Sequence, residues 1–172
     1  AAGTGGHVMP GLAVAEEMKK RGWTVSWIGT PVGMESRLVG QRNIEFDALD
    51  FTGMRGKGIA HMVGGAFKLV KACFAAKSIV QKRQADALFS TGGYIAVPAA
   101  FGARSRNKPL IMMNCDAGSL MSVRAVMPWA QAVMCGFDGE CAHRAGDKAI
   151  VSGNPVREDI LAMPDPIQRY EG

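Results

Sequence analysis

The residues that could do chemistry begin with a glycine-rich stretch near the start of the chain, Gly3-Thr4-Gly5-Gly6-His7. Three glycines within four positions let the backbone turn tightly and approach a ligand without a Cβ atom in the way. Pro10 suits the first turn of a helix, which we expect to end at Gly22. Because a helix N-terminus presents free N–H groups and a positive dipole end, this stretch predicts an anion site. At its rim, the imidazole of His7 could exchange a proton near neutral pH.

Three later loops also carry glycine beside polar residues, and each follows a segment that we expect to be a strand. They are residues 91–94, 114–118 and 152–157. In a parallel sheet flanked by helices, ligands bind at the carboxyl ends of the strands. We therefore expect residues 3–7 and these three loops to converge on one rim of the sheet.

The segments between the loops alternate between strand and helix patterns. Strands are predicted at 23–28, 43–49, 86–90, 108–113, 130–135 and 148–151. Helices are predicted at 10–22, 33–39, 59–80, 95–103 and 119–126, with a break expected at Gly64-Gly65. This alternation predicts an α/β fold class with a Rossmann-like, doubly wound, mostly parallel sheet. Because such a glycine loop normally follows a strand and only Ala1 and Ala2 precede it, we expect that an N-terminal strand has been trimmed.

Length and composition fit one globular domain, with 172 residues, 48% of them hydrophobic and 20% charged. No apolar run reaches the roughly 18–20 residues that span a bilayer, and the chain does not start with a secretory signal pattern. The four cysteines lack a CxxC spacing, which indicates reduced thiols in a cytosolic protein. Since Cys135, Cys141 and His143 also fit no common metal-site spacing, we expect neither a metal nor another cofactor.

The net charge of +5 comes from residues 55–83, which hold seven Lys and Arg and no Asp or Glu. Subtracting these seven charges from the total leaves −2 for the rest of the chain. Within the segment, residues 59–80 carry apolar side chains at helical spacing, with lysines off that stripe. Two interpretations stay open: an ordinary surface helix, or a basic amphipathic helix that docks on an anionic membrane surface. Nucleic acid is not an expected partner, because aromatic interleaving and a binding motif are both absent.

Four motifs, in order and with matching spacing, give the chain a family likeness. They are Gly3-Thr4-Gly5-Gly6-His7 with Pro10-Gly11-Leu12-Ala13, Gly53-Met54-Arg55-Gly56-Lys57-Gly58, Gly92-Gly93-Tyr94 and Gly153-Asn154-Pro155-Val156-Arg157. Over essentially its whole length the chain resembles the N-terminal half of the bacterial peptidoglycan N-acetylglucosaminyltransferases, GT-B enzymes of glycosyltransferase family 28. The resemblance implies that residues 1–157 form a Rossmann-like acceptor-binding domain. Residues 158–172 would then begin the linker to a C-terminal donor-binding domain.

The resemblance implies an inverting transferase of peptidoglycan synthesis. Such an enzyme moves N-acetylglucosamine from UDP-GlcNAc to lipid I, an undecaprenyl-linked muramyl pentapeptide, and gives lipid II. It also implies a peripheral protein on the cytoplasmic face of the bacterial inner membrane, and a half enzyme that is inactive alone. A lipid-linked acceptor favours the membrane-docking interpretation of the basic helix. The residues expected to face the membrane are Met62, Val63, Phe67, Lys68, Lys71 and Phe74.

Site roles follow from the resemblance position by position. His7 matches the general base on the acceptor hydroxyl. The donor-binding positions are Thr4, Gly5, Gly6, Asp116 and Arg157, and the acceptor-diphosphate positions are Gly3, Gly92, Gly93 and Tyr94. Backbone N–H groups and dipoles, rather than an obligatory metal, are expected to stabilise the leaving UDP. For residues 92–94, a plain strand-to-helix turn is the alternative interpretation.

One stretch departs from the family pattern. Where the family reads His-Glu-Gln-Asn after a buried strand, this chain reads Met113-Asn114-Cys115-Asp116. An ionised carboxylate at position 116 cannot donate a hydrogen bond and would repel a nearby diphosphate, so we expect weaker donor binding there. This motivates a second hypothesis, a non-catalytic module that binds a nucleotide or a lipid diphosphate. An NAD-type dehydrogenase is disfavoured because the first loop lacks the GxGxxG spacing.

Overall fold

The computed structural model describes residues 1–52 and 59–163, and of residues 59–63 and 159 the backbone only. The strands are β1 (Ser26–Gly29), β2 (Glu45–Ala48), β3 (Leu88–Ser90), β4 (Leu110–Asn114), β5 (Ala132–Cys135) and β6 (Ala149–Val151). The α-helices are α1 (Gly5–Lys20), α2 (Met34–Gly40), α3 (Ile59–Lys82), α4 (Ala96–Arg104), α5 (Met121–Val126), α6 (Glu140–Ala145) and α7 (Glu158–Leu161). Short 3-10 helices follow α5 and α6, at Met127–Trp129 and Gly146–Lys148. The sequence patterns located every strand but did not predict α6.

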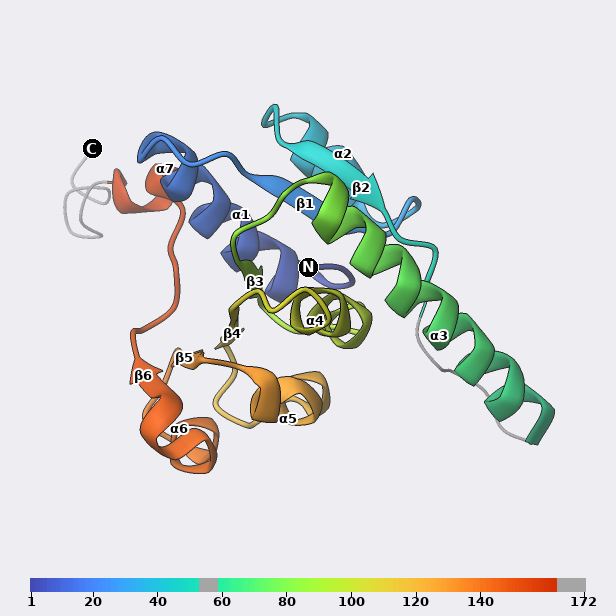
Figure 1. Cartoon of the computed structure of the whole chain (residues 1–172). Helices are drawn as coiled ribbons and strands as arrows, with labels where there is room; N and C mark the ends of the chain where they lie inside the picture. The colour runs from blue at the N-terminus through green and yellow to red at the C-terminus, as the bar shows by residue number, and fades with distance from the viewer. Residues whose placement is uncertain (53–58, 164–172) are drawn as a thin grey trace.

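All strand pairs are parallel, which confirms the predicted α/β class (Figure 1). The strands form two sheets, β1-β2 and β3-β4-β5-β6, rather than one continuous sheet. The first two residues lie where the sheets meet: the Ala1 amino group donates to the Ile28 carbonyl at 3.3 Å, and Trp27 Nε1 donates to the Ala1 carbonyl at 2.9 Å. Ala2 is fully buried.

Helix α1 begins earlier than the sequence predicted. It starts at Gly5, so Pro10 lies inside the helix instead of in its first turn. The carbonyl of Thr4 accepts the N–H groups of His7 at 3.0 Å and Val8 at 3.2 Å, which places His7 in the first helical turn. The predicted end is confirmed, because Gly22 takes a φ of +83° and Trp23 N–H bonds back to the Met18 carbonyl.

Helix α3 runs unbroken through Gly64-Gly65, so the expected break is wrong. Its packed face differs from the predicted stripe: Ala72, Ala76 and Val80 are buried. At Gly102 of α4, a Cβ atom would lie 2.8 Å from the backbone of Ala76, so small residues let the two helices approach closely. Phe67, Val70 and Phe74 of α3 are exposed, whereas Leu69 and Ile79 pack against the core.

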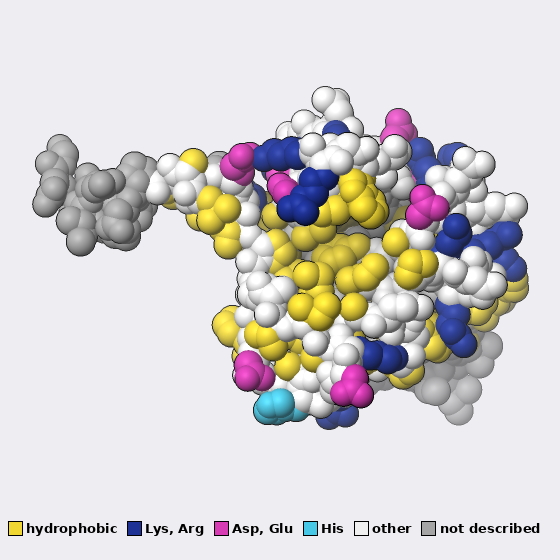
Figure 2. Space-filling view, turned by 60° about the vertical axis from the view of Figure 1, so that its left-hand side comes forward, with side chains coloured by type: hydrophobic (Ala, Val, Ile, Leu, Met, Phe, Trp, Pro, Cys, Tyr) yellow, Lys and Arg dark blue, Asp and Glu magenta, His cyan; other side chains and the backbone are white. Residues whose placement is uncertain are grey.

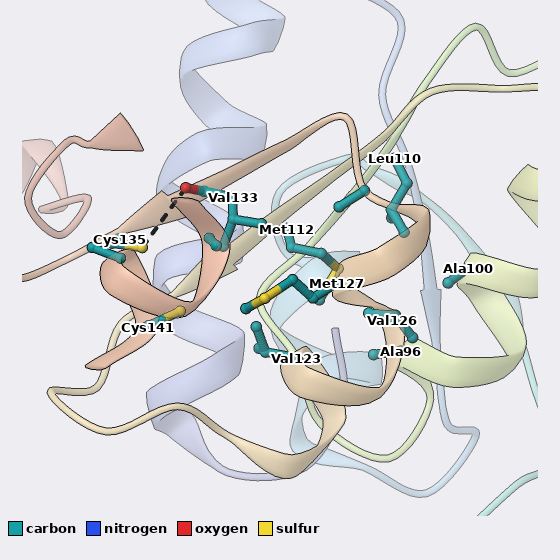
Figure 3. Packing of buried hydrophobic residues seen from close by; sticks show 13 residues of the cluster. Ala96, Ala100, Leu110, Met112, Val123, Val126, Met127, Val133, Cys135 and Cys141 are labelled. Atoms are coloured by element: carbon teal, nitrogen blue, oxygen red, sulfur yellow. Dashed lines mark hydrogen bonds between the residues drawn. The ribbon is translucent and has the colours of Figure 1, made fainter. Parts of the chain in front are cut away.

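Buried side chains from opposite faces of the strands form separate core clusters. Trp27 packs with residues of α1, whereas its neighbour Ile28 packs against the cluster that includes Ala72 and Ala76 of α3. Successive residues of a strand point to opposite faces, so α1 and α3 cover opposite sides of β1. A further cluster joins β4 and β5 to α4, α5 and α6 (Figure 3).

The last strand, β6, forms an edge of its sheet and exposes Ile150 and Val151. Figure 2 shows hydrophobic side chains gathered over the face that lies to the left in Figure 1. Helix α7 also contributes exposed apolar side chains, Ile160 and Leu161. None of the described helices is both long and apolar enough to cross a bilayer.

Candidate functional site

The N-terminus of α1 presents unused hydrogen-bond donors. Thr4 is the N-cap residue, but its side chain makes no capping hydrogen bond. Within the described ranges 1–52 and 59–163, no group accepts the N–H of Gly5 or Gly6. Thr4 and Gly6 are exposed. Two backbone donors, one hydroxyl and the positive end of a 16-residue helix therefore face solvent together, an arrangement that suits an anion.

The second glycine turn packs directly against this helix start. Thr91 Oγ1 donates to the His7 carbonyl at 2.7 Å. Gly93 has a φ of +83°, and a Cβ atom there would lie 2.5 Å from the Ala2 carbonyl oxygen and 3.7 Å from the His7 ring. A Cβ atom on Gly3 would touch the Tyr94 ring at 3.4 Å. The structure thus brings residues 3–7 and 91–94 together, as predicted from the sequence.

The N–H groups of the second turn already have partners inside the protein. Gly92 N–H donates to Ser90 Oγ at 3.3 Å, and Gly93 N–H donates to Ser122 Oγ at 3.1 Å. A diphosphate that used these donors would have to replace the serine hydroxyls. Diphosphate binding by Gly92 and Gly93 remains a prediction.

The loop after β4 is shaped by one buried amide, Asn114. Its Nδ2 donates to the carbonyls of Asp116 at 2.6 Å and Gly118 at 3.0 Å, and its Oδ1 accepts the Leu120 N–H at 3.3 Å. The Asp116 side chain is exposed, so only its backbone takes part. The sequence analysis treated Asn114 only as a departure from the family pattern. The sequence did contain a signal for this structural role, because Asn114 is an amide at the end of an otherwise apolar strand.

The loop after β6 reaches the same region through Asn154. Its Nδ2 donates to the Cys115 carbonyl at 3.1 Å. Gly136, at the end of β5, has no room for a Cβ atom, which would lie 2.1 Å from Asn154 Oδ1. The carboxyl ends of β4, β5 and β6 therefore meet in one group of loops, which accounts for part of the expected convergence.

Arg157 lies apart from the predicted donor-binding residues at the start of α1, Thr4, Gly5 and Gly6. It lines a cavity of about 500 Å³ at the C-terminal end of α1, together with Glu16, Lys19, Lys20, Arg42 and Glu158. Because α1 rises about 1.5 Å per residue, its 16 residues separate Arg157 from Gly5 by roughly 20 Å. The structure does not bring Arg157 and residues 4–6 together, and the donor role of Arg157 remains a prediction.

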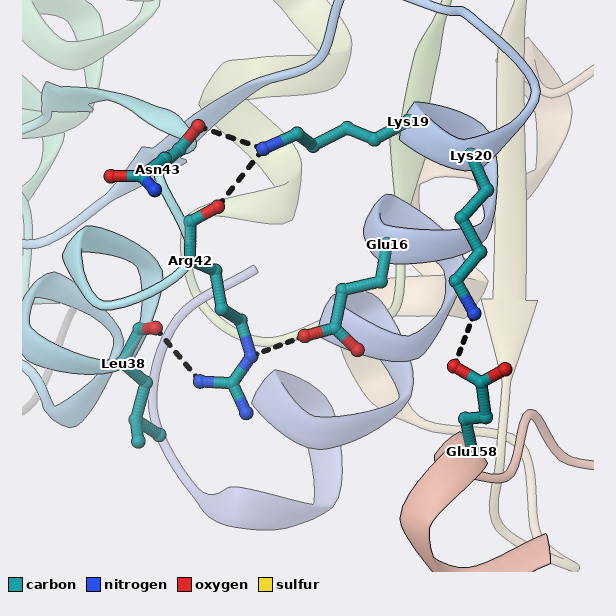
Figure 4. Close-up of polar contacts among 7 residues, drawn as sticks. All are labelled: Glu16, Lys19, Lys20, Leu38, Arg42, Asn43 and Glu158. Atoms are coloured by element: carbon teal, nitrogen blue, oxygen red, sulfur yellow. Dashed lines mark hydrogen bonds and ion pairs between the residues drawn. The ribbon is translucent and has the colours of Figure 1, made fainter. Parts of the chain in front are cut away.

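Several charged groups around this cavity bond to one another or to nearby backbone carbonyls (Figure 4). Arg42 Nε donates to Glu16 at 2.6 Å, and Lys20 forms an ion pair with Glu158. Lys19 Nζ donates to the carbonyls of Arg42 and Asn43, each at 2.9 Å. These contacts hold α7 and the turn after α2 against the end of α1.

Two thiols, Cys115 and Cys135, have raised pKa values that favour their protonated form. Burial, and to a smaller degree the charge of Asp116, raises the pKa of Cys115 to about 11. Burial and the neighbouring Cys141 raise the pKa of Cys135 to about 12. A protonated thiol is a poor nucleophile and a poor metal ligand. In the part of the chain that the structure describes, no three His, Cys, Asp or Glu side chains are grouped as a metal site would require.

The outer surface of α3 combines apolar and basic side chains. Phe67 is 73% exposed and Phe74 61% exposed, and Lys68 and Lys71 are exposed beside them. The side chains of Met62 and Val63 lie outside the described residues.

The C-terminal end of α3 has a different role. Arg83, just beyond it, donates to Asp47 on β2 at 2.6 Å. Lys82 lies 3.5 Å from the same carboxylate. Part of the basic charge of residues 55–83 therefore connects α3 to the sheet.

Behind the first glycine loop lies a buried carboxylate that the sequence analysis did not single out, Glu35. Its Oε1 accepts the Thr30 N–H at 2.9 Å and the Thr30 hydroxyl at 2.6 Å. Burial by itself would raise the pKa of Glu35, but hydrogen bonds from Thr30 and from the Gly3 N–H outweigh it and hold the pKa below its usual value. The sequence of α2 did not indicate that Glu35 is buried, because acidic residues are common in the first turn of helices on a protein surface.

Comparison with known proteins gives a consistent family. Residues 1–134 match the glycosyltransferase family 28 N-terminal domain. The UDP-N-acetylglucosamine--N-acetylmuramyl-(pentapeptide) pyrophosphoryl-undecaprenol N-acetylglucosamine transferase of Janthinobacterium sp. (strain Marseille) is 46% identical over 170 residues, covering 99% of this chain and 47% of the relative. The protein of the same name from Methylibium petroleiphilum is 48% identical over 175 residues, which cover 100% of this chain and 47% of that relative. The chain spans about half the length of these relatives.

Solved structures agree with the sequence relatives. The crystal structure of Acinetobacter baumannii MurG superposes with a TM-score of 0.79 at 32% identity, covering 96% of this chain and 48% of that one. The calicheamicin glycosyltransferase CalG4 superposes with a TM-score of 0.60 at 12% identity, and the match covers 88% of this chain and 51% of CalG4. At that identity the second likeness concerns the fold alone.

Proposed function

The chain belongs to the glycosyltransferase family 28 N-terminal domain family, and on that basis we propose that it forms the acceptor-binding half of an N-acetylglucosaminyltransferase. The complete enzyme would transfer N-acetylglucosamine from UDP-GlcNAc to lipid I and release lipid II and UDP. The observation that carries this proposal is the junction of two glycine turns at the start of α1. There, unpaired N–H groups face solvent and His7 lies against residues 91–93.

In this mechanism His7 accepts the proton of the acceptor hydroxyl. The hydroxyl oxygen attacks the anomeric carbon of the donor from the face opposite UDP, and the bond from that carbon to the diphosphate oxygen breaks. The anomeric configuration is therefore inverted, and UDP leaves with the bonding electron pair. The donors at Gly5 and Gly6 and the positive end of α1 would stabilise the developing negative charge.

The test is His7→Ala in a full-length transferase that contains this chain. General-base catalysis contributes about 10²- to 10⁴-fold, so kcat should fall by that factor while the KM for UDP-GlcNAc changes little. Transfer to a lipid I analogue is measured at saturating donor. His143→Ala is the matched control. His143 is an exposed residue of α6, and its Nε2 lies 3.7 Å from Asp138 Oδ1. Wild-type turnover in His7→Ala would exclude the general-base role.

A non-catalytic binding module is the second candidate function, favoured by the exposed carboxylate of Asp116. A module of this kind would bind UDP-GlcNAc or a lipid diphosphate without transferring sugar. The same assay separates the two functions. Binding of the donor without transfer by the unsubstituted full-length protein would support the module.

We also propose that α3 docks the protein on an anionic membrane surface, which would place it on the cytoplasmic face of the inner membrane. The exposed pair Phe67 and Phe74 could insert among lipid headgroups, while Lys68 and Lys71 interact with anionic phosphates. Each well-placed lysine contributes about 1 kcal/mol to such binding. Docking there would bring the lipid-linked acceptor close to the domain that we propose receives it.

A further inference from the structure

Asn114, the last residue of β4, is a buried amide that bonds to both sides of the loop that follows it. The residue is 0% exposed. Its Nδ2 donates to the carbonyls of Asp116 and Gly118, and its Oδ1 accepts the Leu120 N–H. A buried amide that loses its partners is costly, so these bonds fix the side chain and the loop backbone relative to each other. They reach the part of the loop that carries Asp116 and the part that leads into α5.

Glu140 and Asn154 hold the same loop from the outside. Glu140 Oε2 accepts the Ser119 N–H at 3.3 Å, and Asn154 Nδ2 donates to the Cys115 carbonyl at 3.1 Å. Both bonds are exposed, where water competes for the same groups, and each reaches one point of the loop. Asn114 bonds to three points from the interior, so we assign it the larger part in fixing the loop.

Helix α5 begins directly after a residue that Asn114 holds. Leu120 is the N-cap of α5, and a leucine side chain cannot accept the free N–H groups of a helix start. The helix has six residues and therefore little stability of its own, so tertiary contacts decide where it lies. Val123 and Val126 anchor α5 in the core. The bond from the Leu120 N–H to Asn114 fixes its start relative to the end of β4.

The start of α5 packs in turn against the second glycine turn. Gly93 N–H donates to Ser122 Oγ at 3.1 Å. A Cβ atom on Gly92 would lie 3.2 Å from Ser122 Oγ and 3.5 Å from Leu120 Cδ1. Gly92 and Gly93 have φ values of +93° and +83°, and such glycines are conformationally permissive, so contacts from outside keep the turn in one arrangement. This is the turn that lies against the His7 ring.

We propose that Asn114 is a positioning residue that keeps the loop bearing Asp116 and the second glycine turn in one fixed arrangement. It acts on the loop through the carbonyls of Asp116 and Gly118, and on the turn through Leu120 and Ser122. Asn114 touches no ligand in this role. Under the proposed transferase function, the loop belongs to the donor side and the turn to the acceptor side, so one buried amide aligns both substrates. This catalytic consequence rests on the proposed function, whereas the link between loop and turn does not.

Amide hydrogen exchange, followed by NMR in this chain, tests the link to the turn. We expect Asn114→Ala to speed exchange at both Leu120 and Gly93 by about fivefold or more, because the hydrogen bond that fixes the start of α5 is lost. Ser122→Ala should speed exchange at Gly93 and leave Leu120 protected. Val39→Ala, a buried truncation in a separate core cluster, controls for general loss of stability. Exchange at Gly93 in Asn114→Ala that matches Val39→Ala would overturn the link.

A second pair of variants tests the same bond without changing Asn114. Leu120 has a φ of −62°, which proline also adopts, so Leu120→Pro removes the N–H at a compatible backbone conformation. Leu120→Ala shortens the side chain but keeps the N–H, and it is the matched control. Gly93 should exchange about fivefold faster in Leu120→Pro than in Leu120→Ala. Equal exchange in the two variants would contradict a link through this hydrogen bond.

Kinetics in a full-length transferase provide the second readout. Small displacements of catalytic groups cost about 10- to 100-fold in rate, so kcat should fall by that factor in Asn114→Ala, and the KM values for UDP-GlcNAc and for a lipid I analogue should both rise. Ser122→Ala should raise only the KM for the lipid I analogue. An Asn114→Ala enzyme that reacts like Val39→Ala would overturn the positioning role. Absence of transfer in the unsubstituted enzyme would refute the proposed function instead, and the exchange measurements would still decide the role of Asn114.

Discussion

At the scale of single residues, neighbours in one loop have separate tasks. Asn114 is buried and determines the shape of residues 114–120 through three side-chain hydrogen bonds. Asp116 contributes its backbone carbonyl to that shape, while its carboxylate faces solvent. A substitution at Asp116 can therefore change the charge of the loop without changing its conformation.

We predict that Asp116→Asn strengthens donor binding. The substitution keeps the backbone contact with Asn114, removes a negative charge that would repel a diphosphate, and adds an amide donor. An interaction between two unit charges at about 4 Å in water is worth about 1 kcal/mol, so the KM for UDP-GlcNAc should fall about fivefold in the full-length enzyme. Asp138→Asn, another exposed carboxylate, should leave the KM unchanged. An unchanged or higher KM in Asp116→Asn would show that position 116 does not face the donor.

At the scale of elements, α3 shows how packing can select a different face from the one that hydrophobic periodicity suggests. The predicted stripe contains Phe67 and Phe74, both exposed in the structure. The buried face instead contains Ala72 and Ala76, and the backbone of Ala76 lies against Gly102 of α4. Small residues allow close contact between helix backbones, and this leaves Phe67, Lys68 and Lys71 exposed on the outer side of α3, while Phe74, also exposed, meets the Phe101 ring of α4 edge-on at 6.4 Å.

This surface leads to a prediction about vesicles. Replacing both Phe67 and Phe74 with Ser should lower co-sedimentation of the chain with vesicles that contain anionic lipid by about tenfold or more, because burying one such side chain contributes about 1.5–3 kcal/mol. Added salt should weaken the binding that Lys68 and Lys71 provide. Val32→Ser is the matched control, since Val32 is 88% exposed on the turn after β1. Equal binding to neutral vesicles at low and high salt would argue against docking on an anionic surface.

At the scale of the whole molecule, the first two residues connect the sheets. Ala1 bonds to β1 through its amino group and its carbonyl, and Ala2 packs against the turn after β3.

Much of the architecture could be predicted because its signals are local. Residues 23–28 and 108–113 have the β-branched and apolar composition of buried strands, and each contains or overlaps an observed strand. Gly22 ends α1 in the predicted left-handed conformation. Helix α6 was missed because its six residues have no apolar stripe long enough to show a helical period.

The sequence by itself determined where the chain turns, which segments are strands, and that glycine loops follow them, because these properties depend on neighbouring residues. It also predicted that residues 3–7 and 91–94 lie together, which the contacts between them confirm. Only the tertiary structure decided that α3 turns its small residues inward, that Arg157 lies at the far end of α1, and that Glu35 is buried against Thr30. Each of these depends on contacts between residues distant in the sequence, and no local pattern records which distant residues will meet.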